Sequence, residues 1–250
     1  MSERSEPHSK SDLKAEIARA AVTALVRDGQ RLGLGSGSTA LEVIRRVGAE
    51  VAAGRLPGLT VVPTSRQAQV ACWDLGLSPV GLSDPSVRGK VDVLIDGADE
   101  VDPAWRLTKG GGAALLTEKI VASVAARYAI VVDDGKLVER LGTRHPVPVE
   151  VVPDALPVAL SALDRLALTG TVREAVRKAG PVITDHGNLI IDAQPAGAFD
   201  PEAVERELAT VPGVVCVGIF TRPVDDLFVG RSETDVTRYR PGEDAHAERR

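Results

Sequence analysis

The sequence predicts an α/β fold: an open, Rossmann-like, mainly parallel sheet with helices on both faces, joined to a smaller ferredoxin-like α+β domain. Two observations predict this fold. Up to about residue 146, short apolar strands alternate with amphipathic helices, which is typical of a parallel sheet covered on both faces. From residue 147 the order changes to one close to β-α-β-β-α-β. The chain has 250 residues, 44% of them hydrophobic, which is enough for one large and one smaller domain.

The first part of the chain supplies the larger sheet. Apolar residues three and four positions apart predict a helix over residues 13–25, which Asp28-Gly29 ends. The elements that follow are a strand at 31–34, a helix at 39–51, a strand at 59–62, a helix at 66–75, a strand at 91–95, a helix at 117–128 and a strand at 129–132. Two short apolar segments in residues 222–240 are expected to return to this sheet. Residues 11–146 and 222–240 thus form the larger predicted domain, an α/β domain.

Residues 147–221 form the predicted small α+β domain. Its expected elements are a strand at 149–152, a helix at 156–168, a strand at 172–176, a hairpin of 182–184 with 188–192, a helix at 201–210 and a strand at 214–220. Asp185-His186-Gly187 makes the hairpin turn, and Asp200 caps the second helix. Residues 1–10 and 241–250 are polar and are expected to be mobile tails.

Charge and composition exclude several classes of protein. Thirty Lys and Arg against 35 Asp and Glu give a net charge of −5, which argues against a nucleic-acid partner. No run of 18 apolar residues predicts a membrane span, and the first residues carry no apolar signal core. Two cysteines, without a Cys/His spacing typical of metal sites, predict neither a disulfide framework nor a metal centre. We therefore expect a soluble, cytoplasmic, metal-independent protein.

A glycine-rich turn lies between the strand at 31–34 and the helix that follows. Residues 33–40 read Gly-Leu-Gly-Ser-Gly-Ser-Thr-Ala, so backbone amides, hydroxyls and a helix N-terminus come together in a form that suits a phosphate. The turn matches only the looser alanine variant of the dinucleotide fingerprint, and no Gly-Lys-Ser/Thr follows as in a Walker A loop. A tight turn with an ordinary serine cap is the alternative.

An acidic turn, Asp96-Gly97-Ala98-Asp99-Glu100, directly follows the strand at 91–95. Ligands of open parallel sheets bind outside the carboxyl ends of the strands, where this turn lies. Its carboxylates fit either a Mg²⁺ site or the acid–base recognition of a polyol, and a solvated turn is the plain alternative.

Two further lysine-containing turns fit the same edge of the sheet. Lys109 precedes three glycines, so a cation and flexible amides could stabilise an oxyanion, and Glu118 follows in the first turn of a helix. A helix start lowers the pKa of a carboxyl and burial raises it, so a general base at Glu118 requires that burial outweigh or balance the helix start. An acid that merely complements the helix dipole is the alternative. Lys136, after the strand at 129–132, could reach the same cleft or be an ordinary turn lysine.

Together these segments resemble the type A ribose-5-phosphate isomerases. The residues that carry the resemblance are 33–40, Ser65-Arg66-Gln67-Ala68, 96–100, 109–112 with Glu118, and Gly135-Lys136, and it extends over residues 11–240. Ser36 stands where many members have threonine, and Gly135 where serine is more usual. The resemblance implies interconversion of D-ribose 5-phosphate and D-ribulose 5-phosphate through an enediolate, with no metal or organic cofactor. It also implies a homodimer or homotetramer.

The resemblance assigns roles to individual residues. Glu118 matches the proton-transferring base, and the other predicted catalytic groups are Asp96, Asp99 and Lys109. The predicted substrate-binding residues are Ser36, Gly37, Ser38, Thr39, Asp96, Gly97, Ala98, Asp99, Lys109, Gly110, Gly111, Gly112 and Lys136. The predicted partner is a small sugar phosphate, with neither nucleic acid nor membrane.

Three other functions remain open at this point. A non-catalytic, sugar-phosphate-sensing module of the same fold would share the turn at 33–40 and leave Glu118 and Lys109 idle. A Mg²⁺-dependent phosphatase would use Asp96 and Asp99, and a chelator would abolish its activity. Another acyl- or amino-sugar enzyme of the same fold group is the third. An isomerase assay with ribose 5-phosphate, with and without chelator, separates them from an isomerase.

Overall fold

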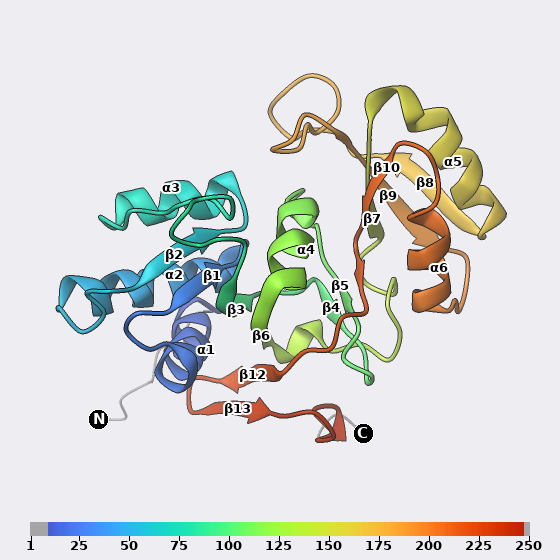
Figure 1. Cartoon of the computed structure of the whole chain (residues 1–250). Helices are drawn as coiled ribbons and strands as arrows, with labels where there is room; N and C mark the ends of the chain where they lie inside the picture. The colour runs from blue at the N-terminus through green and yellow to red at the C-terminus, as the bar shows by residue number, and fades with distance from the viewer. Residues whose placement is uncertain (1–9, 248–250) are drawn as a thin grey trace, which may run out of the picture.

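The computed structural model describes residues 10–247, and its central feature is a six-stranded sheet of order β13-β12-β6-β3-β1-β2 (Figure 1). The strands are β1 (Arg31–Leu34), β2 (Thr60–Pro63), β3 (Val91–Asp96), β6 (Ala125–Asp133), β12 (Asp226–Ser232) and β13 (Asp235–Tyr239). All neighbours are parallel except β13, which pairs antiparallel with β12 at the edge. The two segments expected within residues 222–240 therefore lie in this sheet.

Helices cover both faces of this sheet because its strands are apolar on both sides. They are α1 (Lys10–Leu25), α2 (Ser38–Ala52), α3 (Arg66–Asp74) and α4 (Leu115–Val124). On β3, Val93 and Ile95 pack with α1, α2 and α3, whereas Leu94 packs on the other side with α4. This alternation follows from the two-residue period of a strand. It is the doubly covered parallel sheet that the sequence predicts.

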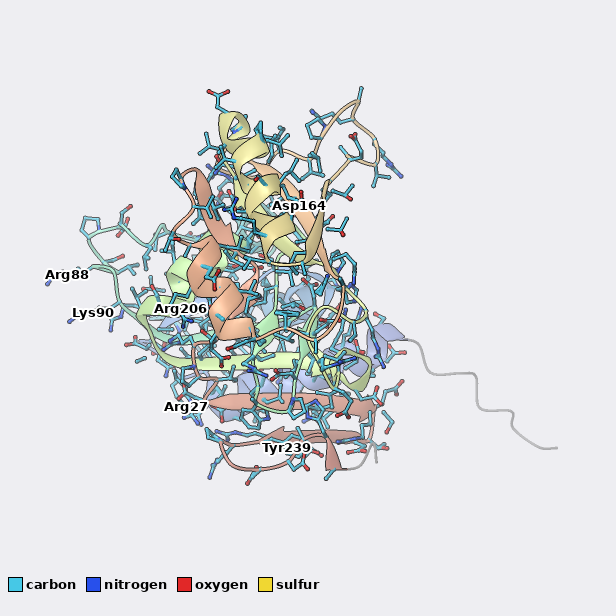
Figure 2. All side chains as sticks on the ribbon, turned by 90° about the vertical axis from the view of Figure 1, so that its right-hand side faces the viewer. Arg27, Arg88, Lys90, Asp164, Arg206 and Tyr239 are labelled. Carbon is cyan, nitrogen blue, oxygen red and sulfur yellow. The ribbon has the colours of Figure 1, made fainter. Side chains whose placement is uncertain are left out.

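A second, antiparallel sheet of order β10-β7-β9-β8 is called here the small sheet. Its elements are β7 (Val147–Val151), α5 (Leu156–Arg165), β8 (Leu168–Val172), β9 (Leu189–Pro195), α6 (Pro201–Leu208) and β10 (Val214–Val217). Their order along the chain is the ferredoxin-like one that the sequence predicts. Figure 1 shows α4 between this sheet and the six-stranded one. Figure 2 shows α5 with Asp164 and α6 with Arg206 far from Tyr239 on β13.

A third, three-stranded sheet connects the two larger ones and was not predicted. Its order is β11-β5-β4, with β4 (Glu100–Val101), β5 (Leu107–Thr108) and β11 (Ile219–Phe220). The strand expected at 214–220 is divided at Gly218, where an added Cβ would lie 2.4 Å from the Lys109 carbonyl oxygen. This close approach brings Lys109 beside the small sheet. Two short 3₁₀ turns complete the fold, η1 (Asp134–Lys136) and η2 (Pro153–Ala155).

Several predicted boundaries are wrong because strand pairing overrides helical spacing. The helix expected to reach residue 128 ends at Val124, since β6 starts pairing with β3 at Ala125. The helix expected at 156–168 ends at Arg165, and the strand expected at 172–176 lies at 168–172, where it pairs with β9. The expected hairpin is reduced to one bridge, between Ile183 and Leu189.

The C-terminal segment 241–247 is not detached from the fold, which corrects the expected tail. Ala245 and His246 are buried, and the His246 Nε2 lies 3.2 Å from the Val101 carbonyl oxygen. At the other end, Lys10 already belongs to α1. The remainder of the two expected mobile tails, residues 1–9 and 248–250, lies outside the described residues.

Candidate active site

The candidate site lies at the carboxyl ends of three adjacent parallel strands. Strands β6, β3 and β1 are neighbours in the sheet, and each is followed by one of the motifs found in the sequence. The glycine turn follows β1, the acidic turn follows β3, and the turn containing Lys136 follows β6. Parallel pairing brings these turns to the same edge, where ligands of such sheets bind.

The glycine turn is fitted closely against the acidic turn. An added Cβ on Gly35 would lie 2.0 Å from Asp96 Oδ1, so only glycine allows this approach. The Ser36 and Gly97 amides donate to the same oxygen, at 3.1 and 2.8 Å. Gly37 precedes α2 and has φ +88°, a conformation that glycine adopts without strain. The glycine turn therefore places its backbone amides at the start of α2, where a bound anion is favoured.

Neighbouring side chains hold the hydroxyls of this turn in place. The Ser36 hydroxyl donates to Ser65 Oγ at 2.7 Å and lies 3.1 Å from Thr64 Oγ1. The Gly37 amide donates to Gln67 Oε1 at 2.9 Å. Ser65 and Gln67 belong to the segment that contributes to the family resemblance, and Ser65 also caps α3 through the Ala68 amide.

A lysine of the first helix also reaches this turn, and sequence reasoning missed it. The Lys14 Nζ of α1 donates to Ser38 Oγ at 2.8 Å. Since Ser38 begins α2, the ammonium lies beside hydroxyl groups at a helix N-terminus. That surrounding is suited to a phosphate dianion, which both a cation and free amides would stabilise.

At the centre of the site a buried lysine lies between two carboxylates. The Lys109 Nζ lies 2.9 Å from Asp96 Oδ2 and 3.3 Å from Glu118 Oε2, and it donates to the Gly97 carbonyl at 2.6 Å. Asp96 is fully buried, and Lys109 and Glu118 are only 3% and 4% exposed. Glu118 lies in the first turn of α4, which begins at Leu115.

This burial changes the acidity of Glu118 and Lys109. Burial raises the pKa of Glu118 to about 7, because the attraction of Lys109 only partly offsets it and the charge of Asp96 adds to it. Burial alone would lower the pKa of Lys109, but the charges of Asp96 and Glu118 outweigh it and the pKa is raised. At neutral pH Lys109 is therefore charged, while Glu118 can both accept and release a proton.

The glycine loop 110–112 lies beside Asp99 of the acidic turn. The Gly111 amide donates to Asp99 Oδ2 at 2.7 Å, and an added Cβ on Gly111 would lie 2.7 Å from Asp99 Oδ1. Gly110 has φ +105°. Glycine is thus needed for both the shape of the loop and its contact with Asp99.

Glu100, the last residue of the acidic turn, points away from the cavity and stabilises a neighbouring loop. Glu100 is fully buried, and its carboxylate accepts hydrogen bonds from the backbone amides of Gly142, Arg144 and His145 at 2.6 to 3.0 Å. His145 is fixed in this way, and its Nε2 lies 3.5 Å from the Lys136 Nζ. Glu100 therefore orders the loop beside Lys136, outside the cavity.

One cavity brings nearly all of the predicted site residues together. Of the thirteen predicted binding residues and Glu118, only Asp96 is absent from its lining; it is fully buried and contacts Lys109. The lining consists of Ser36, Gly37, Ser38, Thr39, Gly97, Ala98, Asp99, Lys109, Gly110, Gly111, Gly112, Glu118, Val131, Val132 and Lys136. Within residues 10–247 no three His, Cys, Asp or Glu side chains are grouped as metal ligands. No helix in the same range is long and apolar enough to cross a membrane.

Known proteins are similar to this chain in sequence and in fold. The family model of ribose 5-phosphate isomerase A (phosphoriboisomerase A) matches residues 60–234. The ribose-5-phosphate isomerase A of Treponema pallidum is 43% identical over 230 residues, which cover 89% of this chain and 91% of the relative. That of Synechococcus sp. (strain WH7803) is 42% identical over 239 residues, which cover 94% and 99%.

Solved structures of ribose-5-phosphate isomerases have the same fold as this chain. Ribose 5-phosphate isomerase A from Methanocaldococcus jannaschii superimposes with a TM-score of 0.86 at 40% identity, covering 93% of this chain and 100% of the other. A D-ribose-5-phosphate isomerase in complex with phospho-erythronic acid gives a TM-score of 0.88 at 37% identity, with the same coverage.

With these relatives, the fold and the site define an aldose–ketose isomerase of phosphorylated sugars. The chain belongs to the ribose 5-phosphate isomerase A family. Its reaction is the interconversion of D-ribose 5-phosphate and D-ribulose 5-phosphate, as the resemblance of its motifs implied.

Proposed function

We propose that Glu118 carries the proton between the two carbons that exchange the carbonyl group. In the forward direction the open-chain aldehyde loses its C2 proton to the Glu118 carboxylate, and the released electron pair forms an enediolate. The same carboxyl returns the proton to C1, while a hydroxyl proton moves between the two oxygens to complete the ketose. A base of pKa about 7 suits both halves, because it binds and releases a proton near neutral pH.

The enediolate oxygens need donors, and Lys109 supplies the charged one. Its ammonium contacts Glu118 and Asp96, so it lies next to the place where the base acts. In a buried site such an interaction is much stronger than in water and needs little reorganisation. The glycine loop after Lys109 supplies backbone amides beside it.

The two aspartates have different environments, which favours different roles. Asp96 is fully buried and already engaged by Lys109 and by the Ser36 and Gly97 amides. Asp99 lines the cavity. We assign ring opening and hydroxyl proton transfer to Asp99, and to Asp96 the fixing of Lys109.

The phosphate of the substrate is bound at the far end, by the Ser36–Thr39 turn together with Lys14 and Lys136. Hydroxyls, helix amides and two ammonium groups recognise a dianion without taking part in the reaction. Binding energy gained there orients the reacting carbons. The ligand of the relative fits this arrangement, because phospho-erythronic acid carries a phosphate at one end and a planar carboxylate, shaped like an enediolate, at the other.

Assembly and location are further proposals. We propose a homodimer or homotetramer in the cytoplasm, working without metal or organic cofactor, as the family resemblance implies. Light scattering of the purified protein after size-exclusion chromatography tests the assembly, and a monomer would contradict it.

The contact between buried Lys109 and Glu118, 3.3 Å apart at the cavity wall, carries the proposal. The experiment is a coupled isomerase assay with ribose 5-phosphate, with and without EDTA, on the parent and on Glu118→Gln. We expect activity that EDTA does not change, and a kcat lowered by about 10²–10⁴ in the variant with KM little altered. Glu207→Gln, the same change at an exposed position of α6, is the control. Near-normal turnover of Glu118→Gln would remove Glu118 from this role.

A further inference from the structure

The glycine loop of the active site is held from outside by an arginine that lies next to the small sheet in the chain. Arg173 directly follows β8, and its backbone amide donates to the Ile190 carbonyl at 2.8 Å. Its Nη1 donates to the carbonyls of Gly110 and Gly111, at 2.9 and 3.0 Å. Arg173 does not line the cavity, so it contacts the loop from behind.

The guanidinium of Arg173 is itself fixed by a carboxylate of the next strand. Asp192 of β9 accepts from Nε at 2.9 Å and from Nη2 at 2.5 Å. The two side chains are 16% and 24% exposed. A bidentate pair of this kind fixes the plane of the guanidinium, so the direction of its remaining nitrogen is fixed as well.

Holding these carbonyls also sets the direction of the loop amides. Every peptide bond in the described chain is trans, so the C=O of one residue and the N–H of the next point to opposite sides. With the Gly110 carbonyl on Arg173, the Gly111 amide points away from it and reaches Asp99 at 2.7 Å. With the Gly111 carbonyl on Arg173, the Gly112 amide also points away from the guanidinium, and Gly112 lines the cavity.

We propose that Arg173, held by Asp192, is a positioning residue for the isomerase reaction. By fixing the Gly110 and Gly111 carbonyls it sets the Gly112 amide and the Asp99 carboxylate toward the reacting end of the substrate. The proposal rests on the function proposed above, in which the enediolate is stabilised at this wall of the cavity. It connects the small sheet to the chemistry, although that sheet supplies none of the residues lining the cavity.

The chain contains a matched control for this arrangement. Arg31 and Asp92 form the same bidentate pair between β1 and β3, at 3.0 and 2.5 Å. The remaining nitrogen of Arg31 donates to the Val87 carbonyl, at 3.4 Å. Arg31 begins β1, whereas the active site lies beyond the other end of that strand. Loss of this pair thus tests what a comparable strand-to-strand ion pair does away from the glycine loop.

The test compares Arg173→Met, Asp192→Asn and Arg31→Met with the parent. Loss of a single oxyanion donor commonly costs about 10²–10³ in kcat, and a donor that is loosened rather than removed should cost less. We expect kcat to fall about tenfold to a hundredfold in Arg173→Met and about threefold to tenfold in Asp192→Asn. KM for ribose 5-phosphate should change less than threefold, because the phosphate end is untouched. Arg31→Met should keep kcat within about twofold.

Inhibition by phospho-erythronic acid separates positioning from mere stability. If the loop binds the enediolate, the inhibition constant should rise in Arg173→Met in proportion to the loss in kcat/KM, whereas Arg31→Met should leave it unchanged. A fall in melting temperature shared by both arginine variants, with equal kcat and inhibition constants, would overturn the proposal. If Arg173→Met does not fold, Asp192→Asn decides: parent-like kcat and inhibition constant in a folded variant refute it.

The same experiment distinguishes failure of the inference from failure of the proposed function. An inactive parent, or a fully active Glu118→Gln, contradicts the proposed function. An active parent that requires Glu118, together with a parent-like Arg173→Met, contradicts only the positioning role of Arg173.

Discussion

The raised pKa of Glu118 predicts how the stability of the folded protein depends on pH, which can be measured without substrate. Its pKa rises from an ordinary value of 4.5 to about 7 in the folded protein, mainly because it is buried. The folded state therefore holds the proton more tightly than the unfolded state. The stability that this gives is complete below about pH 4.5 and is lost as the pH rises through about 7. The shift of about 2.5 units corresponds to about 3 kcal/mol, at about 1.36 kcal/mol per unit.

Glu118→Gln removes the titrating group and keeps its shape. Lys109 should stay paired in this variant, because Asp96 and the Gly97 carbonyl remain in contact with it. The variant lacks the pH-dependent loss that the parent suffers. The free energy of unfolding of Glu118→Gln minus that of the parent should therefore increase by about 3 kcal/mol between pH 4.5 and pH 8.

Urea unfolding of both proteins at several pH values between 4.5 and 8 measures this difference. Glu207→Gln, the same change at an exposed position of α6, is the control. In parallel, kcat/KM of the parent should rise with pH through about 7, as the base loses its proton. A stability difference between Glu118→Gln and the parent that is flat, or that falls with rising pH, would refute the buried-acid reasoning.

Four further substitutions test the remaining contacts. Ser38→Ala and Lys136→Ala should mainly raise KM for ribose 5-phosphate in steady-state assays, and a loss confined to kcat would contradict phosphate binding at these residues. Lys14→Met should raise KM about threefold to tenfold at low salt and less at high salt, because it removes one charge-assisted contact; an unchanged KM would exclude Lys14 from the phosphate site. Gly35→Ala should yield little soluble, active protein, because its Cβ would lie 2.0 Å from Asp96 Oδ1. An expression test and an activity assay check this, and a soluble variant with the activity of the parent would contradict it.

The sequence located the cavity because its motifs follow neighbouring parallel strands. Each local pattern, such as the turn at 33–40 or the run at 96–100, already contained a strand end followed by functional groups, and parallel pairing brings strand ends together. Lys14 and Arg173 could not be found in this way. Lys14 is one polar position on an ordinary helix, and its contact with Ser38 depends on how α1 packs. Arg173 follows a strand whose predicted position was four residues too late, so its contact with the glycine loop could not be predicted.

The predicted element boundaries were wrong where tertiary contacts decide them. Residues 125–128 continue the helical spacing of α4, yet they pair with β3 and become strand. The pairs of residues in β4, β5 and β11 are too short to give any periodic pattern, and only their mutual pairing makes them strands. Glu100 illustrates the same limit, since the motif containing it could not show that its carboxylate faces the loop at 142–145.

The buried cluster allows charge to move without creating an unpaired charge in the interior. Before reaction, the Lys109 cation is shared between Asp96 and an ionised Glu118. In the proposed reaction, Glu118 becomes neutral when it accepts the C2 proton, and the negative charge appears on the enediolate beside the same ammonium. The net charge around Lys109 is therefore unchanged in this step, so the large cost of an unpaired buried charge is avoided. Because the pKa of Glu118 is about 7, a lysine held between Glu118 and a second carboxylate meets that requirement in both directions of the proposed reaction.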